Sequence, residues 1–350
     1  WQSLLPARGR RQDGMGSALL APLALAPALA AGAGAAALAN CALLAALYRR
    51  SSNGLFSILI QLVVADVILL VAVISPEIWT YNSRTWSFGF AGCVAYKGTD
   101  VFASTASLYF IVTLALHCLA TLDLEAREEL RRRKRSSDVE DEEVRSSRHS
   151  LVAPSDSSTP RGLRVPSGAA RRVAVRTPSV CVWVLAASLS VPQLVLATTR
   201  ARDHATHCYV TDASHRLNIH TMLAVFNLIF PAFIFCVIIA LAIAKLKAIK
   251  RLAVIDNEET VAAVKLSLYL IIVYVVMCAP RSVLTMLGVL ASSQDDVPAA
   301  PSASMAVLSL ACTCVYLAAL LLRPVLCILT LPRLRKIFTI GAKNVDVDEV

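Results

Sequence analysis

The sequence predicts an all-α membrane protein, folded as a bundle of seven transmembrane helices. Of its 350 residues, 57% are hydrophobic and only 17% are charged, whereas soluble domains average roughly 45–50% apolar and about 25% charged residues. The apolar residues are concentrated in uncharged stretches of the length that crosses a bilayer, roughly 20 residues each. The chain is therefore an integral membrane protein, and arguments based on a globular core do not apply to it.

Seven stretches have this length and composition. Their expected bounds are Ser17–Tyr48, Asn53–Tyr81, Phe90–Leu122, Val180–Thr198, Leu217–Lys245, Thr260–Leu290 and Ser304–Leu331. Several of them contain proline, which a membrane helix tolerates because neighbouring helices re-satisfy the backbone groups that proline frees.

The first stretch has a second interpretation as a signal peptide, because it follows Met15 and contains Ala-x-Ala sequences. The apolar region of a signal peptide is only about 7–15 residues long. This stretch continues to Tyr48 and stops at Arg49 and Arg50, which is a stop-transfer pattern. We expect a true span, with the signal peptide as the alternative.

Lysine and arginine are distributed unevenly over the connections between the spans. One alternating set carries clusters such as "RRRKR", and the other set contains only Arg8, Arg10, Arg11, Arg84, Arg200, Arg202 and Arg216. Because cytoplasmic loops carry the excess of positive charge, the N-terminus is expected outside and the C-terminus in the cytosol of a multi-pass plasma-membrane protein. The same topology explains the net charge of +10, so nucleic-acid binding is not expected.

The ten cysteines show no zinc-ligand spacing, and most lie in apolar stretches, where cysteine behaves as a small hydrophobe. Only Cys93 and Cys208 lie in polar sequence, and the predicted topology puts both outside. An oxidising compartment favours a disulfide between them, with two unpaired thiols as the alternative. No metal site, cofactor or enzyme motif is expected.

The connection formed by residues 123–178 is rich in Arg, Glu, Ser and Pro and has almost no large apolar residues. Such a composition cannot bury enough surface to fold alone, so this stretch is predicted to be a long disordered cytosolic loop. Its first residues, "LEAREELRRRKR", are also compatible with an extension of the third helix. Residues 1–16 are expected to form a short extracellular N-terminus, residues 17–331 the bundle, and residues 332–350 a cytosolic tail.

Local motifs follow one another in an order that resembles a known family. The first span contains Asn40 in a Gly/Asn pattern, the second contains "LVVAD" ending at Asp66, and "WSFGFAGC" precedes the third span. These motifs, with the prolines of the later spans, resemble the rhodopsin-like (class A) G-protein-coupled receptors. The segment "TLPRLRKIF" then resembles the family's short amphipathic eighth helix, and "ASLYFIVTLAL" is similar to peptide-hormone receptors.

Several positions depart from the family pattern. The Asp-Arg-Tyr motif at the inner end of the third span, which faces the transducer in the family, reads His117, Cys118 and Leu119 here. The Asn-Pro of the seventh span reads Arg323 and Pro324. The resemblance implies the family fold, while these departures argue against the usual mode of coupling to a heterotrimeric G protein.

Two charges are expected deep in the bundle. At a rise of 1.5 Å per residue, Arg323 lies roughly 15 Å and Asp66 roughly 18 Å from the inner end of their spans, and an unpaired charge there costs about 2.5–3.5 kcal/mol. In the resembling family the positions of Asp66, Ser107 and Arg323 belong to a sodium-binding pocket. We predict that Arg323 pairs with Asp66 and replaces the sodium ion in a polar core that includes Asn40. The alternative is that each charge finds separate carbonyls or water.

Further charges are expected in the outer half of the bundle. Lys97 and Asp100 lie three apart on the third helix and share a face, and Asp100 occupies the position that binds the ligand ammonium in amine receptors. Arg281 in the sixth span and Asn227 in the fifth complete a candidate ligand site. Groups of both signs suit a zwitterion or short peptide, and the alternative is that Asp100 and Arg281 pair and bind nothing.

The function expected from these features is that of a receptor-like signal transducer in contact with membrane lipid, which responds to an extracellular peptide or small polar ligand. The alternative is a receptor-like decoy or scaffold that acts through its long second cytosolic loop without a G protein. A transporter would be expected to show internal repeats, and none is evident.

Overall fold

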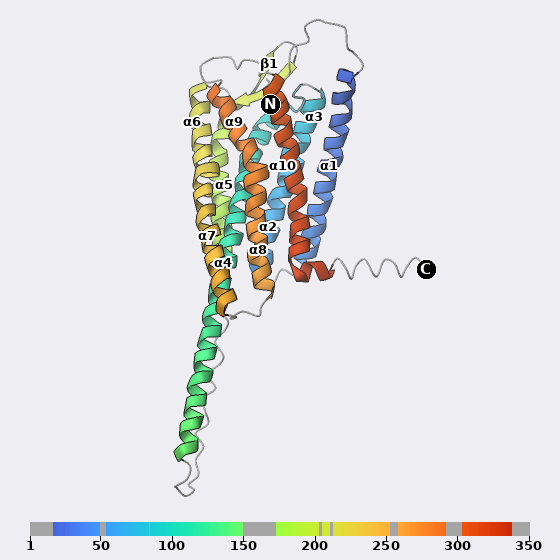
Figure 1. Cartoon of the computed structure of the whole chain (residues 1–350). Helices are drawn as coiled ribbons and strands as arrows, with labels where there is room; N and C mark the ends of the chain where they lie inside the picture. The colour runs from blue at the N-terminus through green and yellow to red at the C-terminus, as the bar shows by residue number, and fades with distance from the viewer. Residues whose placement is uncertain are drawn as a thin grey trace, which may run out of the picture.

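The computed structural model describes residues 17–49, 54–83, 85–149, 173–202, 205–210, 213–252, 258–291 and 303–337. Within these residues, seven helices are long and apolar enough to cross a membrane, which confirms the predicted all-α seven-span bundle (Figure 1). In chain order the α-helices are α1 (Ser17–Tyr48), α2 (Gly54–Leu69), α3 (Ser75–Ser83), α4 (Gly89–His149), α5 (Arg176–Leu196), α6 (Ala213–Ala224), α7 (Phe230–Leu252), α8 (Glu258–Val273), α9 (Ala279–Ala291) and α10 (Ala303–Thr330). The first helix packs against α2 and α10, as the span interpretation requires.

Three spans change their helical pitch in the middle. The π-helical segments are η2 (Leu70–Ile74), which joins α2 to α3, η3 (Val225–Ile229), which joins α6 to α7, and η4 (Tyr274–Cys278), which joins α8 to α9. Each π segment ends two residues before a proline. Proline has no backbone N–H and crowds the carbonyl of the preceding turn, and a wider turn relieves both problems. In the second span, the backbone N–H and the Oγ of Ser75 both donate to the carbonyl of Leu70.

The end of the bundle that contains Cys93 and Cys208, called the disulfide end below, is covered by a hairpin that the sequence analysis did not predict. The fourth span was expected to reach Thr198, but α5 ends at Leu196 and strand β1 (Ala197–Arg202) follows at once, paired antiparallel with β2 (Ala205–Val210). The hairpin joins the loop before α4, because the N–H of Trp86 donates to the carbonyl of Thr206 at 2.8 Å.

The "WSFG" motif shapes this loop. Gly89 has a φ of 67°, a left-handed conformation in which a residue without a Cβ is favoured. Its carbonyl accepts a hydrogen bond from Trp86 Nε1 at 2.8 Å. The motif therefore turns the chain into α4, four residues before the disulfide cysteine.

At the opposite end, α4 corrects the prediction of a disordered loop over residues 123–178. The helix continues to His149 and projects well beyond the bundle (Figure 1). Ion pairs one turn apart join Asp123 to Arg127 at 2.8 Å and Glu129 to Arg133 at 3.4 Å, a spacing that supports helices. The composition argument excluded a buried core, which a solvated helix does not need. Residues 150–172 lie outside the described part of the chain.

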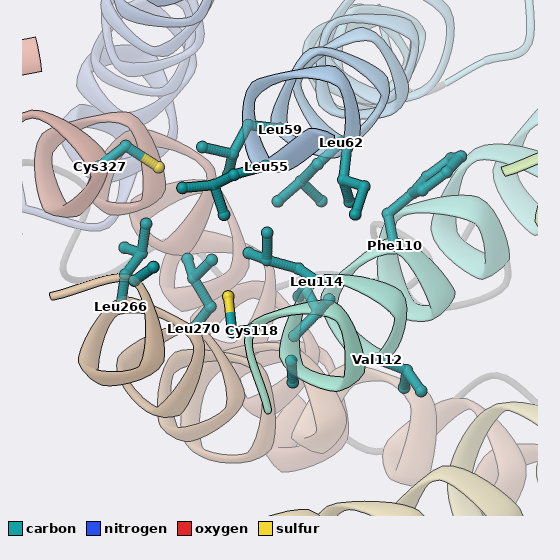
Figure 2. Packing of buried hydrophobic residues seen from close by; sticks show 14 of the residues in the cluster. Leu55, Leu59, Leu62, Phe110, Val112, Leu114, Cys118, Leu266, Leu270 and Cys327 are labelled. Carbon is teal, nitrogen blue, oxygen red and sulfur yellow. The ribbon is translucent and has the colours of Figure 1, made fainter. Parts of the chain in front are cut away.

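The core of the bundle's lower half contains the residues predicted to face a transducer. Figure 2 shows Cys118 between Leu114 and Leu270, and both Cys118 and Leu119 are buried in this apolar cluster. His117 is only partly buried. The role of these three positions stays a prediction, because in the observed packing two of them are covered by other helices.

Residues 332–337 form a short helical segment after α10. Leu334 packs into the core while Arg333 and Lys336 are exposed, which is an amphipathic arrangement. Since only six residues are involved and residues 338–350 lie outside the described part, the eighth helix stays a prediction.

Candidate functional site

The inner polar layer is centred on Arg323 of α10, which is 3% exposed. Its Nη1 donates to Asp66 Oδ1 of α2 at 2.6 Å and to Ser107 Oγ of α4 at 2.6 Å. The Ser107 hydroxyl donates to the same Asp66 oxygen at 2.8 Å. The predicted pair is therefore present, and the arginine occupies the place expected for a cation.

The inner layer also reaches the sixth span. Arg323 Nη2 donates to Cys278 Sγ at 3.3 Å, so one guanidinium connects α2, α4, η4 and α10. Sequence analysis did not assign Cys278 as a partner, because a thiol in an apolar stretch normally packs as a hydrophobe.

The fourth predicted member of the polar core, Asn40, has a different task. Its Nδ2 donates to the carbonyls of Ala36 at 2.8 Å and Leu320 at 3.0 Å. These bonds tie α1 to α10 one turn before Arg323, and neither involves Asp66. Asn40 therefore braces the helix that carries the arginine rather than the ion pair itself.

The outer polar layer contains an ion pair that sequence reasoning missed. Arg281 of α9 pairs with Glu77 of α3, with side-chain exposures of 14% and 7%. The Tyr96 hydroxyl donates to the same Glu77 oxygen, Oε1, at 2.7 Å, and the Arg281 guanidinium lies over the Tyr316 ring at 4.9 Å. The available signal was a lone carboxylate about three turns beyond Asp66 on the same span.

This pair bears on the alternative in which Asp100 and Arg281 neutralise each other. Arg281 is held by Glu77 instead, and Asp100 forms no ion pair among the side chains that the structure describes. Lys97 lies over the Tyr96 ring at 5.3 Å. Asp100 and Lys97 are partly exposed and interact electrostatically with Arg281.

Asn227, the remaining predicted ligand residue, does not join these charges. It lies in η3, where its Nδ2 donates to Thr105 Oγ1 at 3.0 Å and its backbone carbonyl accepts from the Tyr274 hydroxyl at 3.1 Å. The structure thus gathers three of the four predicted residues and leaves the fourth as a link between α4, η3 and η4.

The predicted disulfide between Cys93 and Cys208 is present, with a Cα–Cα distance of 5.5 Å. It joins α4 to β2 and holds the hairpin over the outer polar layer. This covalent link limits how far the hairpin can move away from α4.

The charged end of the bundle, defined by Asp123, Lys245, Glu259 and Arg333, carries a further network. Asp123 of α4 pairs with Lys245 of α7, and Arg333 pairs with Glu259 of α8 at 2.7 Å. Thr260 Oγ1 of α8 also donates to a neighbouring α4 carboxylate, Glu125 Oε1, at 2.8 Å. Cross-links between α4, α7 and α8 therefore exist although Cys118 supplies no charge.

Seven spans, a disulfide from the third span to the following hairpin, and a buried polar centre define a seven-transmembrane receptor fold. The family model for the seven-transmembrane receptors of the rhodopsin family matches residues 164–325, which include α5 to α9 and most of α10. No curated protein sequence matches the chain. Over these residues the chain is therefore similar to the rhodopsin-like receptors.

Proposed function

We propose that the protein is a receptor for an extracellular peptide or small polar ligand, which binds at the disulfide end. The observation that carries this proposal is the charge arrangement there. Asp100 and Lys97 are partly exposed beside a Glu77–Arg281 pair that neutralises itself. Partly exposed charges are costly within a membrane span, and a ligand with groups of both signs would interact with both.

In the proposed orientation the disulfide end faces outward and the charged end faces the cytosol of the cell. The positive-inside rule supports this direction, since the clusters of Lys and Arg lie beyond the charged end. Exposed apolar side chains such as Phe233 and Ile229 would then contact membrane lipid.

Binding would be transmitted by a rearrangement of the helices that opens the charged end. The two π segments η3 and η4 lie between the outer charges and the charged end in the fifth and sixth spans, where π turns commonly mark functional sites. Arg323 would act as a fixed replacement for a sodium ion, so the resting state would not depend on sodium.

Coupling to a heterotrimeric G protein is part of the proposal, with contacts that differ from those of the family. Cys118 is buried and uncharged, so the cytosolic contact would involve His117 and the charged end rather than an arginine at that position.

The test is expression in cells, confirmation of the chain at the cell surface, and measurement of activation of each G-protein family with peptide and amine libraries. Ligand-dependent activation by wild type, lost in Asp100→Asn and Lys97→Gln but retained in the matched control Glu128→Gln, would support the receptor. Silence of wild type combined with a signal in Cys118→Arg would favour the decoy or scaffold.

A further inference from the structure

Only one of the two oxygen atoms of the Glu77 carboxylate accepts hydrogen bonds from the described residues. Oε1 accepts hydrogen bonds from both Arg281 and Tyr96. Oε2 is buried and has no hydrogen-bond partner among the described residues. The hydroxyl of Thr80, three residues later on α3, is also buried without such a partner. Because residues three apart on a helix share a face, one face of α3 presents two unused acceptors.

Unused acceptors of this kind are uncommon inside proteins. Most buried polar side-chain atoms have at least one partner, and those without one call for an explanation. Arg281 is already held by Glu77 Oε1 on one side and by the Tyr316 ring on the other. No described side chain donates to Oε2 in this arrangement, and we look for its donor in a bound ligand.

The surrounding charges indicate what kind of donor fits. Asp100 interacts electrostatically with both Arg281 and Tyr96 and has no ion pair among the described side chains. Lys97 lies over the Tyr96 ring and interacts electrostatically with Asp100. A basic group that approaches Glu77 Oε2 would therefore meet a second carboxylate nearby.

We infer that Glu77 Oε2 and Thr80 Oγ1 form an acceptor site for the basic group of a ligand, which is a guanidinium or a primary ammonium. This inference rests on the proposed receptor function and names the ligand class. A guanidinium fits best, because its several N–H donors lie in a fixed fork that reaches two acceptors together. The ligand shares the carboxylate with Arg281 and does not displace it.

The site is tested on the purified full chain with Nα-acetyl-L-argininamide as the probe (argininamide below) and Nα-acetyl-L-citrullinamide (citrullinamide below), which has no basic group, as its neutral analogue of nearly the same shape. Ligand-observed NMR titration measures both affinities. A fragment of this size binds with a Kd on the order of 1 mM. Losing a hydrogen bond to a charged group weakens binding by roughly 10–100-fold, so citrullinamide is expected to bind at least about 10-fold more weakly than argininamide.

Two variants locate the binding. Glu77→Gln removes the charge and is expected to abolish the preference for argininamide. Thr80→Val leaves the Glu77–Arg281 and Glu77–Tyr96 contacts in place, so it reports on the site without disturbing the outer layer, and is expected to weaken argininamide several-fold. Glu128→Gln, the same substitution on the exposed part of α4, is the matched control and is expected to bind like wild type.

Three results would each overturn the inference. They are equal affinities for the two amides, no binding of argininamide to wild type, and an unchanged affinity in both Glu77→Gln and Thr80→Val. Because these titrations need no signalling, their failure is distinguishable from failure of the receptor proposal, which the cell assay measures separately.

Discussion

The Arg323–Asp66 pair makes the sharpest prediction about the stability of the bundle. Both side chains are almost fully buried, with exposures of 4% and 1%, and Ser107 bonds both of them. Removing one partner of a buried ion pair leaves an uncompensated charge and costs about 3–5 kcal/mol. Asp66→Asn is therefore expected to lower the folded fraction sharply, since proteins have only about 5–15 kcal/mol of stability in total.

The double variant Asp66→Asn with Arg323→Asn removes both charges at once. Replacing a buried ion pair by uncharged residues is often close to neutral, although the smaller Asn side chain leaves unfilled volume beside Cys278. The double variant is expected to be more stable than Asp66→Asn alone, with a coupling energy of up to about 3 kcal/mol. The assays are surface expression in cells and thermal unfolding of the detergent-purified chain.

A matched control is the ion pair between Arg127 and Asp123, in which Arg127 is 69% exposed. Exposed pairs contribute only about 0–1 kcal/mol, so Arg127→Asn is expected to leave expression nearly unchanged. Equal losses in Asp66→Asn and in the double variant would refute the reasoning, because they would mean that the two charges are compensated separately.

Three further predictions concern other parts of the same architecture. Wild type is expected to unfold at the same temperature in sodium chloride and in potassium chloride. Arg323→Asn leaves the buried Asp66 carboxylate without its cation, so sodium is expected to raise the unfolding temperature of this variant in a thermal-shift comparison. The same response to sodium in wild type and in the variant would contradict a built-in cation. Cys93→Ser breaks the disulfide between positions separated by 115 residues, for which a loss of about 2–5 kcal/mol is typical, and surface staining should fall unless the hairpin docks without it. Thr260→Val removes the hydroxyl that donates to Glu125 at 2.8 Å at little cost in packing. If this contact holds the charged end closed, basal G-protein activation is expected to rise at unchanged surface expression. An unchanged basal signal would show that the contact does not have this role.

The positions of the spans could be predicted closely because a bilayer leaves few choices. A chain in lipid must satisfy its backbone internally, so an uncharged stretch of sufficient length becomes a helix. The first span was expected at Ser17–Tyr48 and α1 has these bounds. The same constraint predicted the Arg323–Asp66 pair, since two charges at equal depth have few other partners.

The partner of Arg281 could not be predicted in this way. The sequence analysis considered only Asp100 as an alternative partner, but Arg281 pairs with Glu77, which lies in a span that contains η2. A π segment widens one turn and changes the direction in which all later side chains of that helix point. A prediction from sequence assumes 3.6 residues per turn throughout the span. It therefore gives the wrong side-chain direction for Glu77, which follows η2, and for Arg281, which follows η4.

The β1–β2 hairpin was missed for a different reason. Its first strand, "ATTRAR", shows no alternation of apolar and polar residues, which is the pattern that predicts a strand. The hairpin is held instead by the Cys93–Cys208 disulfide and by the loop before α4. These contacts are formed by segments far apart in the chain, and a local pattern does not contain them.

The two polar layers are physically connected through the sixth span. Each layer joins an acidic residue of the second span to an arginine: Asp66 to Arg323 in the inner layer and Glu77 to Arg281 in the outer layer. Arg281 lies three residues after Cys278, whose thiol accepts a hydrogen bond from Arg323. A ligand that binds Glu77 beside Arg281 would therefore act one turn away from the residue that contacts the inner layer. A built-in cation at that point cannot dissociate as a sodium ion can, so the proposed activation would shift the arginine within the bundle rather than release it.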